Sequence, residues 1–157
     1  MSTKTKIKIK DNIELRCELD EIYENTDQVI LAKWALSVAK RILKMASIEY
    51  TSVEEIMSGF QTNELWQAGQ ARMHDVRQAG FKVHRLAKDS SNEIKTAALR
   101  TAGQAIGTGH MREHAMVCSD YAVKTIELLS NGNIDRITKE REWQIEELKR
   151  TLHKQNM

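Results

Sequence analysis

The sequence contains no proline among its 157 residues. Because proline removes a backbone donor and breaks helix interiors, its absence suits long helices joined by short turns. Aromatic residues are also scarce, at 5%, so alanine, leucine, isoleucine and methionine must fill the core between the helices. A chain of this length can bury such a core without disulfide or metal staples.

The sequence also lacks a strong charge of one sign and a long apolar run. Lysine and arginine total 24 against 22 acidic residues, which gives a net charge of +2. This balance is unlike the basic surface of a nucleic-acid binder, so no nucleic-acid partner is predicted. The first ten residues carry lysines with no apolar stretch behind them, which argues against a signal peptide or a membrane span. We therefore expect a cytoplasmic protein.

Cysteine is limited to Cys17 and Cys118, whose separation fits no metal or redox motif. Both are expected to be reduced thiols, with Cys118 in the core because it falls on an apolar helical stripe. No serine, cysteine or threonine lies in a recognisable nucleophile signature. The sequence predicts a protein that is not an enzyme and that needs no cofactor.

Apolar residues recur at three- and four-residue spacing along most of the chain, which indicates amphipathic helices. The pattern predicts an all-α fold, a compact bundle of about six helices in a single domain over 1–157, with 1–10 a flexible tail. Ser52 with Glu55 and Ser90 with Glu93 resemble capping boxes, and Asn133 is expected to cap the last helix. The helical segments are expected near 11–25, 27–47, 53–60, 62–88, 93–106 and 111–130, and from 134 onward.

His110 and His114 stand four residues apart, which on a helix would place both imidazoles on one face and suit a transition metal. A metal site needs further ligands, and the candidates His74, His84 and Asp120 are not placed by the sequence. The alternative is that the two histidines bond to backbone carbonyls beside the glycines of 103–109. Those glycines lack the strand and lysine of a phosphate loop, so we interpret them as helix-packing positions.

The segment 11–27 is the one acidic patch that is followed by a strong helix. Such a patch can steer a basic protein toward the chain. Trp66 is a candidate hydrophobic anchor, because exposed tryptophans often contribute strongly to interfaces. The candidate partner-binding residues are Asp20, Glu21, Glu24, Asp27 and Trp66.

Several stretches of the sequence resemble a bacterial family of all-α immunity proteins, the immunity group five-like family. The similar stretches are Leu31 to Ala35 with Ala39 to Leu43, Ala97 to Ala105, Thr108 to Ala115, Tyr121 to Lys124, and Glu140 to Gln144. Their order and spacing agree from about residue 13 to 150. The chain departs from the family where Gln104 replaces the usual histidine, and near 47–60, where it is shorter and free of proline.

The resemblance implies a helical bundle that binds and blocks a cognate protein toxin, which the sequence does not identify. The hypothesis is a non-enzymatic protein that occludes the toxin with a rigid, pre-formed surface. Two alternatives stay open. One is a helical metal- or small-molecule-binding protein that uses His110 and His114. The other is a structural homo-oligomer, such as a homodimer, formed through an exposed apolar face of the last helix.

Overall fold

The computed structural model describes residues 2–156 as seven α-helices and one short 3-10 helix, without any strand in that range. The all-α prediction is confirmed, with seven helices where about six were expected. No helix within the described range is long and apolar enough to cross a membrane. The elements are α1 (Ile13–Glu24), α2 (Gln28–Met45), η1 (Tyr50–Ser52), α3 (Glu54–Gln67), α4 (Met73–Asp89), α5 (Glu93–Gly107), α6 (His114–Leu129) and α7 (Ile134–Gln155).

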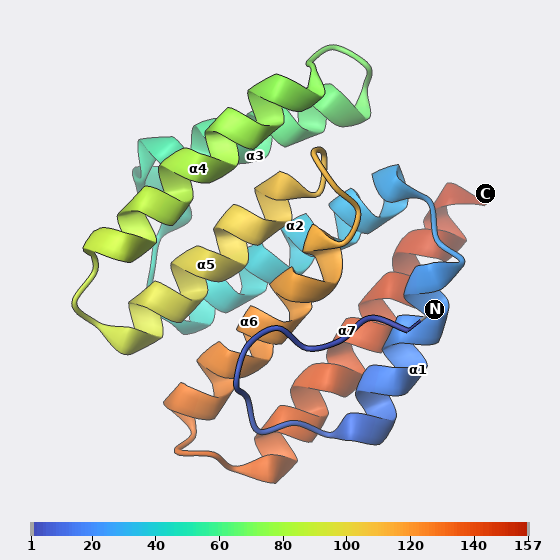
Figure 1. The fold of residues 1–157 in the computed structure, drawn as a ribbon, viewed down its shortest axis with the longest axis vertical. Coiled ribbons are helices and arrows are strands. Elements are labelled where there is room, and N and C mark those ends of the chain that lie inside the picture. The colour runs from blue at the N-terminus through green and yellow to red at the C-terminus, as the bar shows by residue number, and fades with distance from the viewer. Residues whose placement is uncertain (1, 157) are drawn as a thin grey trace.

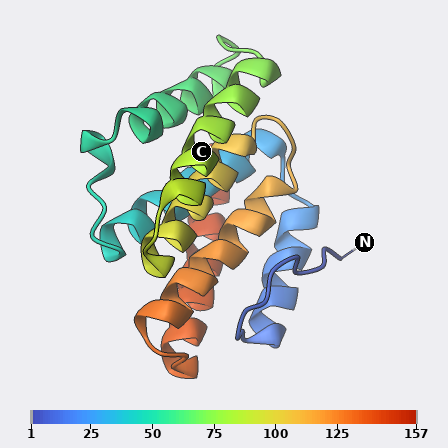
Figure 2. The same cartoon turned by 60° about the vertical axis from the view of Figure 1, so that its left-hand side comes forward.

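Helix α2 lies at the centre and contacts α3, α5, α6 and α7 (Figure 1). Its apolar stripe covers more than one face, as expected of a helix that is covered on several sides. Trp34 has no exposed surface, and its indole Nε1 donates to the backbone oxygen of Gln144 on α7 at 2.9 Å. The α3–α4 hairpin covers one side of α2 and α5, while α1 and α7 lie on the other side (Figures 1 and 2).

The prediction of one helix over 62–88 is wrong, because the chain turns between α3 and α4. Gly69 adopts a φ of +75°, a left-handed conformation that ends helices and favours glycine. The N–H of Gln70 then donates to the oxygen of Leu65 at 2.7 Å, which closes the helix end. The signal was present in the sequence as Gly69, but the continuous apolar spacing concealed it.

The helix starts agree only partly with the predicted capping boxes. The N-cap of α3 is Val53 and that of α5 is Asn92, so the boxes at Ser52 and Ser90 are wrong. Asn92 takes this role because its side-chain oxygen accepts from the N–H of Lys95 at 3.0 Å. The expected cap of α7 by Asn133 is confirmed, with bonds from the N–H groups of residues 135 and 136.

The segment before α1 runs across α6 and α7 in Figure 1, although the sequence suggests a flexible tail. The N–H of Lys10 donates to Glu127 Oε1 at 2.9 Å, and Lys124 Nζ donates to the oxygen of Lys8 at 3.4 Å. At the other end, the N–H of Thr3 donates to Asp20 Oδ2 at 2.9 Å. These bonds tie the segment to helices that are far from it in sequence.

Candidate functional site

The loop between α5 and α6 is hydrogen-bonded on two sides, to α3 and to the corner between α1 and α2. On one side, the Asn63 amide donates to the oxygen of Ile106 at 2.9 Å and to Thr108 Oγ1 at 3.1 Å. The oxygen of Ile106 lies in the last turn of α5, where the backbone hydrogen bonds are incomplete, so Asn63 adds a bond at the helix terminus. Asn63 has no exposed surface, and this bond pattern fixes the loop against α3.

On the other side, the same loop is bonded to the corner between α1 and α2. Gln28 Nε2 donates to the oxygen of Thr108 at 2.7 Å. Arg112 Nη2 donates to the oxygens of Tyr23 and Thr26, each at 2.8 Å, and its guanidinium lies 4.3 Å from the centre of the Tyr23 ring. Burial raises the pKa of Tyr23, and the charge of Arg112 opposes that shift. The bonds from Gln28 and Arg112 thus hold the corner in place.

The predicted partner residues lie at this end of the molecule, and all of them except Asp20 are exposed or half-buried. Glu21, Glu24 and Asp27 are exposed at the corner. Trp66 is half-buried and lies beside the loop: a Cβ on Gly109 would stand 3.1 Å from its ring. The loop thus lies between the acidic corner and Trp66, and we refer to Glu21, Glu24, Asp27 and Trp66 together as the corner surface.

The expectation that Asp20 belongs to an exposed acidic face is wrong. Its relative exposure is 3%, and its carboxylate accepts from both the N–H and the hydroxyl of Thr3. Arg16, one turn earlier on α1, donates to the oxygen of Thr3 at 3.1 Å. Asp20 therefore anchors the N-terminal segment. Sequence spacing placed it on α1 but did not show that another segment covers that face.

His110 and His114 lie close together, with ring centroids 5.8 Å apart. His114 Nδ1 donates to Gln104 Oε1 at 2.6 Å. Gln104 is the residue that replaces the histidine usual in the resembled family. Within the described range, no group of three or more histidine, cysteine or acidic residues could hold a metal ion. Of the other proposed ligands, His84 lines the same small pocket as His110 and His114. Asp120 is instead bonded to arginines, and His74 is exposed on α4.

The glycines of α5 make room for these imidazoles. A Cβ on Gly103 would lie 2.6 Å from His84 Cε1, and a Cβ on Gly107 would lie 3.2 Å from His114 Cδ2. Burial lowers the pKa of His84 to about 4, with help from the charge of Arg100, and burial also lowers the pKa of His114. Both rings are therefore neutral near pH 7. Gly103 and Gly107 are confirmed as helix-packing positions, whereas Gly109 lies in the loop after α5.

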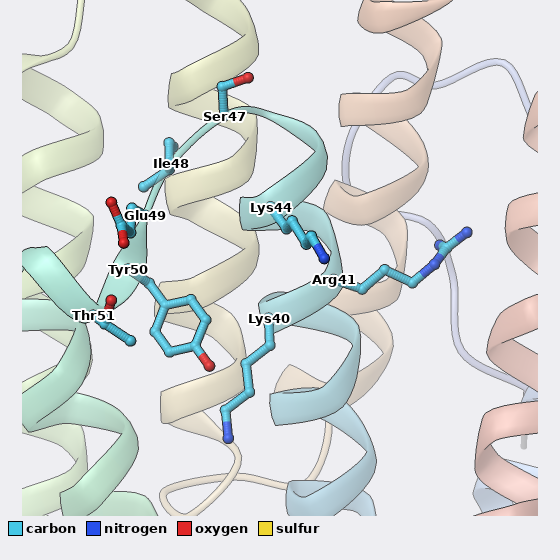
Figure 3. A pocket seen from close by; sticks show the side chains of 8 residues that line it. All are labelled: Lys40, Arg41, Lys44, Ser47, Ile48, Glu49, Tyr50 and Thr51. Carbon is cyan, nitrogen blue, oxygen red and sulfur yellow. The ribbon is translucent and has the colours of Figure 1, made fainter.

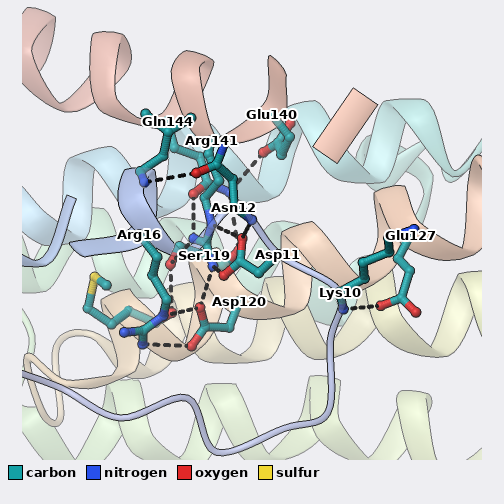
Figure 4. Close-up of polar contacts among 12 residues, drawn as sticks. Lys10, Asp11, Asn12, Arg16, Ser119, Asp120, Glu127, Glu140, Arg141 and Gln144 are labelled. Atoms are coloured by element: carbon teal, nitrogen blue, oxygen red, sulfur yellow. Dashed lines mark hydrogen bonds and ion pairs between the residues drawn. The ribbon is translucent and has the colours of Figure 1, made fainter. Parts of the chain in front are cut away.

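A buried ionic network, shown in Figure 4, is absent from the sequence-based expectations. Arg141 has no exposed surface and donates to both oxygens of Asp11, at 2.9 and 2.7 Å. It also donates to Asp120 Oδ1 at 2.7 Å, while Arg16 donates to both Asp120 oxygens at 3.0 Å each. The network joins α1, α6, α7 and the segment before α1.

The network continues along α7 through Glu140 and Gln144. Gln144 donates to Glu140 Oε2 at 2.9 Å, and Arg41 forms an ion pair with Glu140. Burial raises the pKa of Glu140, and the nearby Arg41 charge opposes that shift. No buried side-chain nitrogen or oxygen in the described part of the chain lacks a partner, so this is a satisfied structural network. Its sequence signal is polar residues on the apolar stripe of α7, at 141 and 144.

The stripe on α7 that was expected to be exposed for oligomer formation is largely buried. Ile137 and Leu148 have no exposed surface, Ile145 has 4%, and the helix contacts α1, α2 and α6. Ile134, at 41%, is its exposed end. The apolar face of the last helix is therefore used within the chain.

An open groove lies between the last turns of α2 and the connection to α3 (Figure 3). Its volume is about 680 Å³. The lining residues are Lys40, Arg41, Lys44, Ser47, Ile48, Glu49, Tyr50 and Thr51. The sequence analysis did not single out this region, because its residues come together only when the chain reverses after α2.

Comparison with known protein families gives a match that covers most of the chain. A family model described as Imm-5 like putative immunity protein matches residues 21–151, most of the chain. Neither the curated proteins nor the solved structures provide a match. The matched range includes the corner surface, the α5–α6 loop, the groove and the polar residues of α7. The chain belongs to the Imm-5 like putative immunity protein family.

Proposed function

We propose that this protein is the antidote of a bacterial toxin–immunity pair, which binds its cognate toxin in the cytoplasm and blocks it by occlusion, without catalysis. The observation that carries the proposal is the family match over residues 21–151. The bundle supports it physically, since buried polar groups are satisfied and the loops are hydrogen-bonded. A rigid surface loses little conformational entropy when it binds.

The corner surface is the proposed contact with the toxin. Glu21 and Asp27 are exposed there, and Trp66 supplies a half-buried aromatic ring nearby. Arg112 and Gln28 hold the corner against the α5–α6 loop. An acidic corner of this kind attracts a basic partner and raises the rate of association.

The first test is protection. A toxin domain encoded beside this gene, or captured with the tagged protein from its native cells, is expressed with and without the chain. We expect the chain to restore growth and to inhibit the purified toxin at one chain per toxin molecule. Inactivation of many toxin molecules by one chain would contradict occlusion, and failure to protect would contradict the immunity role.

The second test concerns the corner surface. The double variant Glu21→Lys and Asp27→Lys should slow association with the toxin by about tenfold at low salt and weaken its salt dependence. The matched control is Glu142→Lys with Glu146→Lys, which makes the same charge change at exposed positions of α7. If both double variants slow association equally, the corner surface is not the contact.

A further inference from the structure

The groove of Figure 3 has one basic side and one apolar side. Lys40 and Lys44 project from α2, one turn apart, and Ile48 and Tyr50 follow on the returning chain. The lining is mostly apolar carbon, including the stems of the lysines. Such a surface can bury an apolar side chain and hold a negative charge beside it.

The apolar side of the groove is pre-formed. After α2 ends, Ser47 adopts a φ of 61°, and the N–H of Ile48 donates to the oxygen of Leu43 at 2.8 Å. The Tyr50 ring packs edge-on against Phe60, with ring centroids 5.4 Å apart. Phe60 is 2% exposed, so this contact holds Tyr50 against the core. A ligand would therefore meet a surface that needs little ordering.

The lysines of the groove are available to an anion. Lys44 is exposed and has no ion-pair partner in the described range. Lys40 lies 4.0 Å from Glu64, but both side chains are about half exposed, so water screens this pair. Arg41, in contrast, is paired with Glu140 and stacked over the ring of Trp143 at 4.4 Å.

The single acidic residue of the lining does not neutralise them. In Figure 3 the carboxylate of Glu49 points away from Lys40 and Lys44, on the far side of the returning chain. The space between the lysines and the Tyr50 ring is therefore positively charged on one side and apolar on the other.

The shape of the groove indicates what kind of ligand it would hold. Pockets for small molecules usually enclose most of the ligand surface, whereas this groove is open and would cover only one side. A side chain carried by a protein brings its own surroundings, which exclude water from the other side. The open shape therefore favours a protein segment over a free metabolite.

We propose that this groove docks a segment of a protein partner in which an aromatic side chain stands next to carboxylates. The ring lies on Tyr50 and Ile48, and the carboxylates pair with Lys40 and Lys44. We take that protein partner to be the toxin, which rests on the function proposed above. The groove and the corner surface lie at opposite ends of α2, which has 18 residues and is therefore roughly 27 Å long. They are separate surfaces.

The test is a titration of the ¹⁵N-labelled full chain with short capped peptides, followed by NMR. The acidic probe is acetyl-Gly-Glu-Phe-Asp-Gly-amide, and its neutral match is acetyl-Gly-Gln-Phe-Asn-Gly-amide. We expect saturable shifts at residues 40–51 with the acidic probe and binding at least about fivefold weaker with the neutral one. The double variant Lys40→Glu with Lys44→Glu should weaken binding of the acidic probe by at least about tenfold.

The control variant is Lys95→Glu with Lys149→Glu, which changes the charge equally at exposed positions of α5 and α7. Equal weakening by both variants would overturn the proposal, as would the absence of saturable shifts at the groove. Tighter binding of an eight-nucleotide thymidine oligomer at the same residues would also overturn it, in favour of a nucleic acid. Because no toxin is used, failure here leaves the antidote role to its own protection test.

Discussion

Replacement of Arg141 by methionine tests the buried ionic network most directly. The guanidinium has no exposed surface, and its partners Asp11 and Asp120 have side chains that are 8% and 2% exposed. Removal of one member of a buried pair typically costs 3–5 kcal/mol, because the other charge stays buried. Here Asp120 keeps its bonds from Arg16, and methionine retains the apolar stem, so we expect a loss of about 3 kcal/mol.

For a chain of this length, each kcal/mol lowers Tm by roughly 2–4 °C, so Arg141→Met should lower Tm by about 6–12 °C. Urea unfolding followed by circular dichroism measures the free energy directly. Arg150→Met is the matched control on the same helix, since Arg150 is half exposed in its pair with Glu147 and should change stability by under about 1 kcal/mol. A loss of less than about 1 kcal/mol for Arg141→Met would refute the reasoning. A double-mutant cycle with Asp11→Asn should show an interaction energy of at least about 1 kcal/mol.

Three further predictions follow from packing and titration. Gly109→Ala should cost about 1–3 kcal/mol in thermal or urea unfolding, since the added Cβ would lie 2.8 Å from the buried Val76; an unchanged stability would show that the loop adapts. His84 is neutral in the folded protein and protonates more readily when unfolded. Its contribution to the free energy of unfolding is therefore complete above about pH 6.5 and is lost as the pH falls toward about 4. His84→Asn should flatten the stability profile in that window, and a profile that stays unchanged would contradict the shift. Burial raises the pKa of the Cys118 thiol, so a thiol reagent should label only Cys17 in the native chain and both cysteines in denaturant; labelling of two native thiols would refute this.

Part of the corner surface was predictable from sequence, because Glu21, Glu24 and Asp27 fall at the end of an amphipathic helix. Their juxtaposition with Trp66 was not, since it depends on a loop that bonds to both α2 and α3. The groove was not predictable for the same reason. Its lysines look like ordinary surface residues of α2 until the returning chain places Tyr50 beside them.

The sequence by itself determined the helical class and the burial of Cys118, because these depend on local periodicity and on the absence of proline. Tertiary structure alone decided the roles of Asp20 and Arg141. A charged residue at a helical position reads as solvent-facing unless another segment covers it with a complementary group. Thr3 covers Asp20, and Asp11 covers Arg141. Local periodicity could not show this, because both covering residues lie in the segment before α1, and Asp11 is far from Arg141 in sequence.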